Sequence, residues 1–305
     1  MAKYSCIDKN LILIDLDQKP EGFRRFISSW LYKSEELTFL VDPGPLYSIG
    51  ALTSALKEIG VVNLNYILLT HIHIDHAGGT GKLLTFFPET PVLCHPKGMD
   101  HMVNPAKLWE GTVSILGELA LAYGEIVPIP RENIFYEEKI PVGEDTIHVV
   151  ETPGHAPHHV SYIFKHYLFA GEVAGVHQPL PDRTYMRPAT PPKFKLETSL
   201  SSLDRVIEKA PDMICFGHYG HHNDALTMLR LAREQLILWT EVLKEHDAHG
   251  VDDGMEHLME RLIKSDTCFA NYRYLETDLR KREEYFVINS LRGIRGYLND
   301  LAIRG

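Results

Sequence analysis

The first two thirds of the chain carry short apolar runs separated by glycine, proline and histidine, a spacing typical of β-strands. The runs are LILIDLD, LTFLVDPG, NYILLT, TPVLCHP, TIHVVETPG, SYIFKHYLFAGE and DMICFGHYG. Between some of them apolar residues recur every three or four positions, which predicts helices over 49–60, 105–123 and 196–210. This mixture predicts layered sheets and helices over residues 1–224.

The pattern changes after Asp224. Helical spacing covers 226–246, 254–264 and 275–298, with hardly any β-rich run. We therefore predict a helical C-terminal region over residues 225–305. The stretch 178–192 contains five prolines, and we predict an irregular loop there.

The first of these C-terminal helices has more apolar surface than one packed face requires. Its apolar residues are Leu226, Leu229, Leu236, Leu238, Trp239 and Leu243. We expect a homodimer on this ground, and packing against the sheet domain is the alternative.

The composition of the chain argues against nucleic acid and membranes as binding partners. The 305 residues are 44% hydrophobic and carry a formal net charge of -10, which opposes attraction to nucleic acid and to anionic membranes. No apolar segment approaches the roughly 20 residues that cross a bilayer, and no export signal is apparent. We expect a cytoplasmic protein that acts on a small molecule. The four cysteines are far apart and form no CxxC pair, so they indicate neither a disulfide framework nor a thiolate zinc site.

Four side chains of metal-ligand type lie within six residues at the end of the apolar run 66–69. His71 and His73 are two residues apart, so in an extended segment both point to one side and can bind one ion. Asp75 and His76 follow where the chain turns, and they can serve a second ion. A chance cluster is the alternative in a chain with 17 histidines. However, imidazoles and a carboxylate are costly to bury at a strand end without an ion or hydrogen bonds.

The segment THIHIDHAGG resembles the HxHxDH signature of the metallo-β-lactamase superfamily. Three further segments resemble other motifs of that family and occur in the family's order along the chain. LTFLVDPG, with Asp42, precedes the signature, whereas ETPGHAPHH, with His155, and CFGHYG, with His218, follow it. The resemblance spans roughly residues 8 to 224. It implies an α+β fold, a four-layer αβ/βα sandwich, here with a helical C-terminal extension.

The resemblance also implies a ligand set for two divalent ions. One ion would be held by His71, His73 and His155, and the other by Asp75, His76 and His218. Zinc is expected first, with iron or manganese as alternatives, because imidazole and carboxylate accept all three.

One position departs from the family pattern. Where the family has a bridging aspartate after a glycine, this chain reads LFAGEVAG and offers Glu172. We expect Glu172 to bridge the two ions, because carboxylate oxygen suits such cations. The alternative is that Glu172 leaves the bridge and acts as a base.

Two cations about 3.5 to 4 Å apart can supply hydroxide from a bound water near neutral pH. Asp75 would bind one ion and orient that water, which makes it the candidate catalytic residue. Asp42 is expected to support the ligands, with an ordinary turn residue as its alternative. His222 and Tyr185 are candidate substrate contacts, and His158 and His159 flank the ligand segment.

We therefore expect a metal-dependent hydrolase that uses a metal-bound hydroxide to cleave a small ester, thioester or lactone. The helical C-terminal region resembles that of the hydroxyacylglutathione hydrolases. Iron-dependent redox members of the family, such as sulfur dioxygenases, and phosphodiesterases are alternatives on the same ligands. The di-iron oxygen-reducing members typically have an acidic residue at the position of His73, so this histidine favours the hydrolytic branch. A metal-stabilised binding protein is a third hypothesis.

Overall fold

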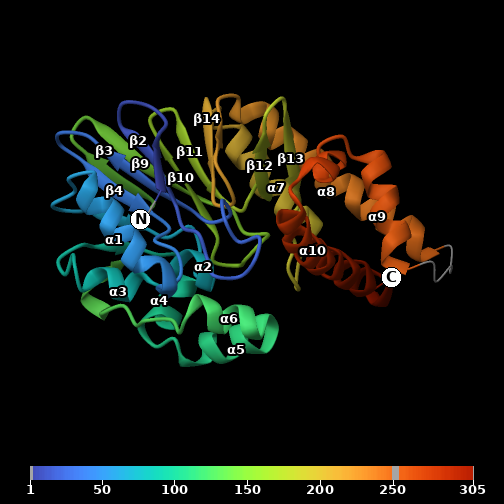
Figure 1. Ribbon diagram of the computed structural model, residues 1–305, viewed down its shortest axis with the longest axis horizontal. Coiled ribbons are helices and arrows are strands. Elements are labelled where there is room, and N and C mark those ends of the chain that lie inside the picture. Colours follow the sequence, from blue (N-terminus) through green and yellow to red (C-terminus); the bar gives the residue numbers. More distant parts are fainter. Residues whose placement is uncertain (1–2, 249–253, 305) are drawn as a thin grey trace.

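Two β-sheets form the middle layers of the molecule (Figure 1). The computed structural model describes residues 3–248 and 254–304. The first sheet contains, in spatial order, β1 (Lys3–Cys6), β2 (Leu11–Asp15), β3 (Ser28–Lys33), β4 (Thr38–Val41), β5 (Tyr66–Leu68), β6 (Val92–Leu93) and β7 (Ile134–Phe135). The second contains β15 (His221–His222), β14 (Met213–Phe216), β11 (Tyr167–Gly171), β10 (Val160–Phe164), β9 (Asp145–Glu151) and β8 (Lys139–Val142).

Strand β2 shows why these runs are apolar throughout. Successive side chains of a strand point to opposite faces. Leu11 and Leu13 face the core between the two sheets, whereas Ile12 and Ile14 face the core beneath the helices. Because both faces of the sheet are buried, the strand is continuously apolar instead of alternating.

Helices cover the outer face of each sheet (Figure 1). On the first sheet lie α1 (Ile49–Glu58), α2 (Ile74–Ala77), α3 (Thr80–Leu84), α4 (Pro96–Val103), α5 (Ala106–Leu116) and α6 (Glu118–Tyr123). On the second lie α7 (Leu196–Ile207) and α8 (Ala225–Ala248), and α8 in turn contacts α9 (Gly254–Ser265) and α10 (Thr277–Arg304) beside the sandwich. Short 3-10 turns are η1 (Leu46–Ser48), η2 (Arg131–Asn133) and η3 (Phe269–Tyr274). The predicted four-layer αβ/βα sandwich with a helical C-terminal extension is confirmed.

Helix α8 packs inside the chain. Leu229, Leu236, Trp239 and Leu243 are all buried in the core shared by the second sheet, α7, α9 and α10. Most of the apolar surface that suggested a dimer is therefore covered within one chain, and Leu226 and Leu238 are half-buried. The homodimer stays a prediction, and sedimentation at micromolar concentration tests it: a monomer would rule it out.

Two elements differ from the sequence-based expectations. The stretch 178–192 is not an irregular loop throughout, because β12 (Val176–Leu180) and β13 (Arg183–Arg187) form an antiparallel hairpin across it. A two-stranded ribbon tolerates Pro179 because each of its strands has an unpaired edge. The helix predicted over 105–123 is interrupted at Gly117, whose φ of 55° ends α5 before α6 begins.

Ligand-type residues follow several strands at one edge of the sandwich. His71 comes after β5, His155 after β9, Glu172 directly after β11 and His218 after β14. Strands β4 and β5 of the first sheet run parallel to each other, and so do β11 and β14 of the second sheet. Within each pair, the carboxyl ends of the two strands therefore point in the same direction. In the described residues no helix is long and apolar enough to span a membrane.

Candidate metal centre

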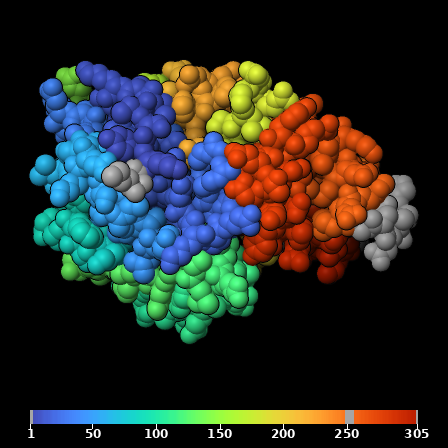
Figure 2. Space-filling view, in the orientation of Figure 1, coloured from blue at the N-terminus to red at the C-terminus, as the bar shows by residue number. Residues whose placement is uncertain are grey.

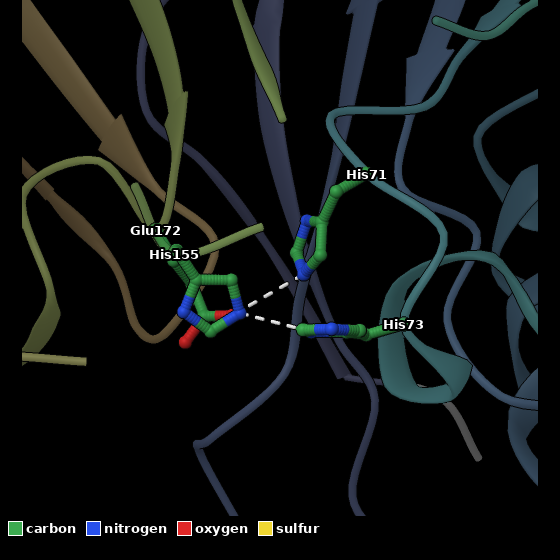
Figure 3. Close-up of side chains that lie close together, drawn as sticks. All are labelled: His71, His73, His155 and Glu172. Carbon is green, nitrogen blue, oxygen red and sulfur yellow. Dashed lines mark hydrogen bonds and ion pairs between the residues drawn. The ribbon is translucent and has the colours of Figure 1, made fainter. Parts of the chain in front are cut away.

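The first group of ligand-type atoms comes from three separate segments (Figure 3). His73 Nδ1 lies 2.9 Å from His155 Nε2, which lies 2.8 Å from Glu172 Oε2. His71 Nε2 is 3.3 Å from the same carboxylate oxygen. Ligand atoms held at about 2.0 to 2.1 Å from one tetrahedral ion are about 3.3 Å apart. The spacing of these four residues suits one such ion.

The second group lies beside the first and consists of Asp75, His76 and His218. The Nε2 atoms of His76 and His218 are 3.2 Å apart. Asp75 Oδ2 is 3.4 Å from His218 Nε2 and 3.8 Å from His76 Nε2. Asp75 and His76 belong to the short helix α2, which begins directly after His73. Their side chains therefore point in other directions than those of His71 and His73 in the segment before the helix.

Glu172 faces both groups. Its Oε2 is 3.7 Å from His76 Nε2, and its Oε1 is 3.6 Å from His218 Nε2, in addition to the contacts with His71 and His155. The residue is 8% exposed. A carboxylate in this position is placed to bridge two ions, in line with the first of the two roles expected for it.

Four imidazoles have their second nitrogen fixed by an acceptor. His76 Nδ1 lies 3.0 Å from Asp42 Oδ2, His218 Nδ1 2.9 Å from Phe26 O, and His155 Nδ1 3.0 Å from Ala189 O. The Thr70 hydroxyl donates its one proton to Asp42 Oδ2, so it accepts from His71 Nδ1. Because a hydrogen-bond acceptor faces each Nδ1, that nitrogen carries the proton of the neutral ring. The Nε2 lone pair of each histidine is then available to bind a metal ion in its ligand group.

This arrangement fits a metal and is costly without a cation. If both rings were neutral, the Nε2 lone pairs of His76 and His218 would face each other across 3.2 Å, so this pair needs either a proton or a metal ion between the two nitrogens. His71 Nε2 is buried and makes no hydrogen bond with any described residue. Buried polar groups usually have partners, so a cation in each group would supply what these nitrogens lack.

Burial and neighbouring charge set the protonation of the ligands. Burial lowers the pKa of His71 well below its usual value and that of His73 to about 4, so both are neutral at pH 7. Burial also lowers the pKa of His76, but Asp75 and Asp42 outweigh it and raise the value to about 9. In Glu172, burial raises the pKa, yet His155 and His218 hold it well below the usual range.

Metal binding is therefore expected to release protons. His76, with a pKa of about 9, is protonated at pH 7.5 when no ion is present, and a ligand imidazole must be neutral. The ion and the proton compete for one lone pair, so affinity falls as the pH falls, by about tenfold per pH unit for each proton displaced. Calorimetry of zinc binding in buffers of different ionisation enthalpy measures this release. Binding with no proton release at pH 7.5 would contradict the assignment.

Gly171 allows Glu172 to reach its position. Its φ is +55°, and a Cβ there would lie 2.5 Å from His159 Nε2 and 2.9 Å from Thr70 Oγ1. His159 Nε2 in turn accepts the backbone N–H of Glu172 at 2.9 Å. The glycine is thus enclosed by the residues that orient two ligands.

Gly171→Ala is expected to destabilise the protein by about 1 to 3 kcal/mol, because of the positive φ and the displaced neighbours. It should also lower the zinc content, since Glu172 moves with its backbone. Gly111→Ala in α5 is the matched control, because a Cβ there meets nothing within 4 Å. Thermal melts and metal analysis of both variants check this. Equal melting temperatures and full zinc content in Gly171→Ala would refute it.

Two predicted substrate contacts lie elsewhere. Tyr185 is fully buried in β13, and its hydroxyl donates to Glu283 of α10 at 3.0 Å. The expected contact of Tyr185 with substrate is therefore wrong, because no solvent or ligand reaches the hydroxyl. His222 is half-buried in β15 and accepts the N–H of Asp224. Among the hydrogen bonds and ion pairs of the described residues, none joins His222 to either group, and its role stays a prediction.

Sequence reasoning missed the groups that orient the ligands. Thr70, next to His71 in the motif, links that histidine to Asp42, and its hydroxyl was a signal in the sequence. The carbonyls of Phe26 and Ala189 had no signal, because every residue has a carbonyl. Asp42, expected to support the ligands, accepts hydrogen bonds from Thr70 and His76.

Comparisons with known proteins agree on one family. The model of the metallo-beta-lactamase superfamily matches residues 22–218. The metallo-beta-lactamase fold-containing protein ST1585 of Sulfurisphaera tokodaii is 30% identical over 208 residues, which are 66% of this chain and 76% of that protein. A hydroxyacylglutathione hydrolase of Buchnera aphidicola is 34% identical over 109 residues, 36% of this chain but only 33% of the relative.

Solved structures show the same fold. The crystal structure of ST1585 superposes with a TM-score of 0.71 at 23% identity and covers 94% of this chain and 99% of its own. The metallo-beta-lactamase family protein TTHA1429 of Thermus thermophilus has a TM-score of 0.66 at 19% identity, with 97% and 95% covered. Both likenesses extend over the C-terminal helices as well as the sheets.

Proposed function

This chain belongs to the metallo-β-lactamase superfamily, and from that premise we propose that it is a two-metal hydrolase that cleaves a small ester, thioester or lactone. The observation that carries the proposal is the pair of adjacent ligand groups joined by Glu172. Each group offers three ligand side chains besides the shared Glu172, so water or substrate would bind as a fifth ligand, a coordination number that zinc in catalytic sites can reach.

Two divalent ions held there would lower the pKa of a bound water toward 7 and polarise the oxygen of the bond under attack. The ligands His71, His73 and His155 would hold one ion, and Asp75, His76 and His218 the other. Glu172 would contact both. The acidic side chains would offset part of the positive charge of the ions in a largely buried site.

Asp75 is suited to handle the proton of the reaction. Burial raises its pKa, but His76 and His218 outweigh burial and hold the pKa at about 2. Asp75 is therefore ionised at neutral pH, and its Oδ2 faces the histidines. Among the hydrogen bonds and ion pairs of the described residues none involves the other oxygen, which can accept a hydrogen bond from water and pass the proton to the leaving group. The side chain is 17% exposed, so substrate can reach it.

The ester and thioester proposal rests on resemblance to relatives. The hydroxyacylglutathione hydrolases that the chain matches align over less than half of their own length. Their printed activity therefore suggests a class of substrate and nothing narrower. A net charge of -10 opposes a polyanionic substrate such as nucleic acid.

A substrate panel tests the proposal. Zinc-loaded protein is assayed against aryl esters, acyl thioesters, lactones and phosphodiesters, with the metal-free protein as the control. We expect hydrolysis of at least one carbonyl substrate that is lost with the metal and restored by zinc. Oxygen uptake with a persulfide by the iron-loaded protein, without any hydrolysis, would replace the proposal with dioxygenase chemistry.

A further inference from the structure

Two backbone carbonyls orient one histidine in each ligand group. Ala189 O accepts from His155 Nδ1, and Phe26 O accepts from His218 Nδ1. Neither carbonyl belongs to a helix or a sheet, so each must be held by contacts from elsewhere. Helix α10 contacts both segments. It contacts the loop between β2 and β3, which contains Phe26, and red atoms adjoin blue ones in the space-filling view (Figure 2).

Arg282 of α10 holds the segment that contains Phe26. Its Nη1 donates to Gly22 O at 2.9 Å and to Arg24 O at 3.3 Å. Its guanidinium lies 4.2 Å from the centre of the Phe26 ring, which stacks on the His218 ring at 4.1 Å. Arg282 thus acts on His218 through both the backbone and the ring of Phe26.

Glu283, the next residue of α10, holds the other segment. It is fully buried and accepts hydrogen bonds from Arg187 Nε and Tyr185 Oη of β13 and from Arg282 Nε. Arg187 precedes Pro188 and Ala189. The buried carboxylate is therefore paired with two guanidinium groups, one of which belongs to the segment that orients His155.

Ser290, two turns further along α10, holds the residues on both sides of Ala189. Its hydroxyl donates to Pro188 O at 3.0 Å, and its carbonyl accepts from the Thr190 hydroxyl at 2.8 Å. The helix approaches closely here, since a Cβ on Gly293 would lie 1.9 Å from Thr190 O. Ala189 itself is left free to offer its carbonyl to His155.

We propose that α10 is a clamp for the metal centre: Glu283 and Ser290 position His155 through residues 187–190, and Arg282 positions His218 through residues 22–26. These three are positioning residues, because none of them contacts a ligand group. The inference rests on the metal centre proposed above. It assigns the C-terminal helix a role in metal binding that does not depend on which substrate is cleaved.

Metal affinity tests the clamp one group at a time. In a His218→Ala background only the group of His155 is intact, and in a His155→Ala background only the group of His218. Ser290→Ala is expected to weaken zinc binding by about tenfold in the first background and not in the second, as outer partners of ligands do. Arg282→Met should weaken binding mainly in the second background, with a smaller loss in the first because Arg282 also donates to Glu283. Competition with a chromophoric chelator measures both.

Val287→Ala is the control for loss of stability, because Val287 is buried on the same helix and belongs to the apolar core. It should lower the melting temperature and leave zinc affinity unchanged. Ser290→Thr keeps the hydroxyl and should restore affinity. If Arg282→Met does not fold, Arg282→Lys is used, since it keeps the charge but only one point of donation. The visible spectrum of the cobalt-substituted protein should change in Ser290→Ala and stay unchanged in Val287→Ala.

The clamp is overturned if Ser290→Ala binds zinc as tightly as its parent, or if Val287→Ala weakens binding equally. A wild-type chain that binds no zinc would instead refute the proposed function, so the two failures are distinguishable.

Discussion

His155→Ala is expected to reduce the bound zinc from about two ions to about one per chain and the rate of hydrolysis by at least about 1000-fold. His155 Nε2 is the centre of the first group, in contact with His73 and Glu172. With one ion left, the attacking water loses one of the two cations that lower its pKa, and the oxygen of the bond under attack loses the second cation that polarises it. Metal analysis and assays on the best substrate of the panel measure both effects.

His148→Ala is the matched control for this prediction. His148 lies exposed in β9, the strand that precedes His155, and belongs to neither group. It should keep full zinc content and activity. Hydrolysis that persists in His155→Ala would mean that the reaction does not use this centre.

Glu172→Gln is expected to lower hydrolysis by roughly 100-fold to 1000-fold and to weaken the binding of both ions. The amide keeps the size of the side chain but loses the charge that faces four histidines. Stepwise zinc titration and steady-state kinetics give the two quantities separately.

This variant separates the two roles open to Glu172. A bridging carboxylate predicts that zinc content falls together with activity. A base predicts that about two ions stay bound and only the rate falls. Glu172→Asp keeps the charge on a side chain one methylene shorter, so under the bridging role it should retain more zinc than Glu172→Gln. Full zinc content with normal activity in Glu172→Gln would contradict both roles.

The sequence was sufficient to predict the strands and the residues that gather in the two groups, for a physical reason. Strands buried on both faces must be apolar at every position, so a run such as LILI is visible without any neighbour. The candidate ligands are equally visible, since five imidazoles and two carboxylates in motifs at strand ends have few structural uses. The structure brings these residues into the same two groups that the resemblance implied.

What the sequence did not show depends on contacts between distant parts of the chain. Arg282 meets Gly22 across 260 residues, and no local pattern indicates such a pair. Tyr185 was expected near a substrate because it follows Glu172, but its hydroxyl turns to α10 instead. The hairpin of β12 and β13 was hidden by prolines, which normally argue against a strand. Carbonyl acceptors, such as those of Phe26 and Ala189, leave no trace in a sequence.

Metal content of the protein purified without added metal tests the central claim most directly. The two ligand groups predict about two divalent ions per chain, zinc or manganese, measured by mass spectrometry on the purified chain. A single iron would indicate that Glu172 does not bridge and would favour redox chemistry. Protein that contains no metal, and takes up none when zinc is supplied, would contradict the account.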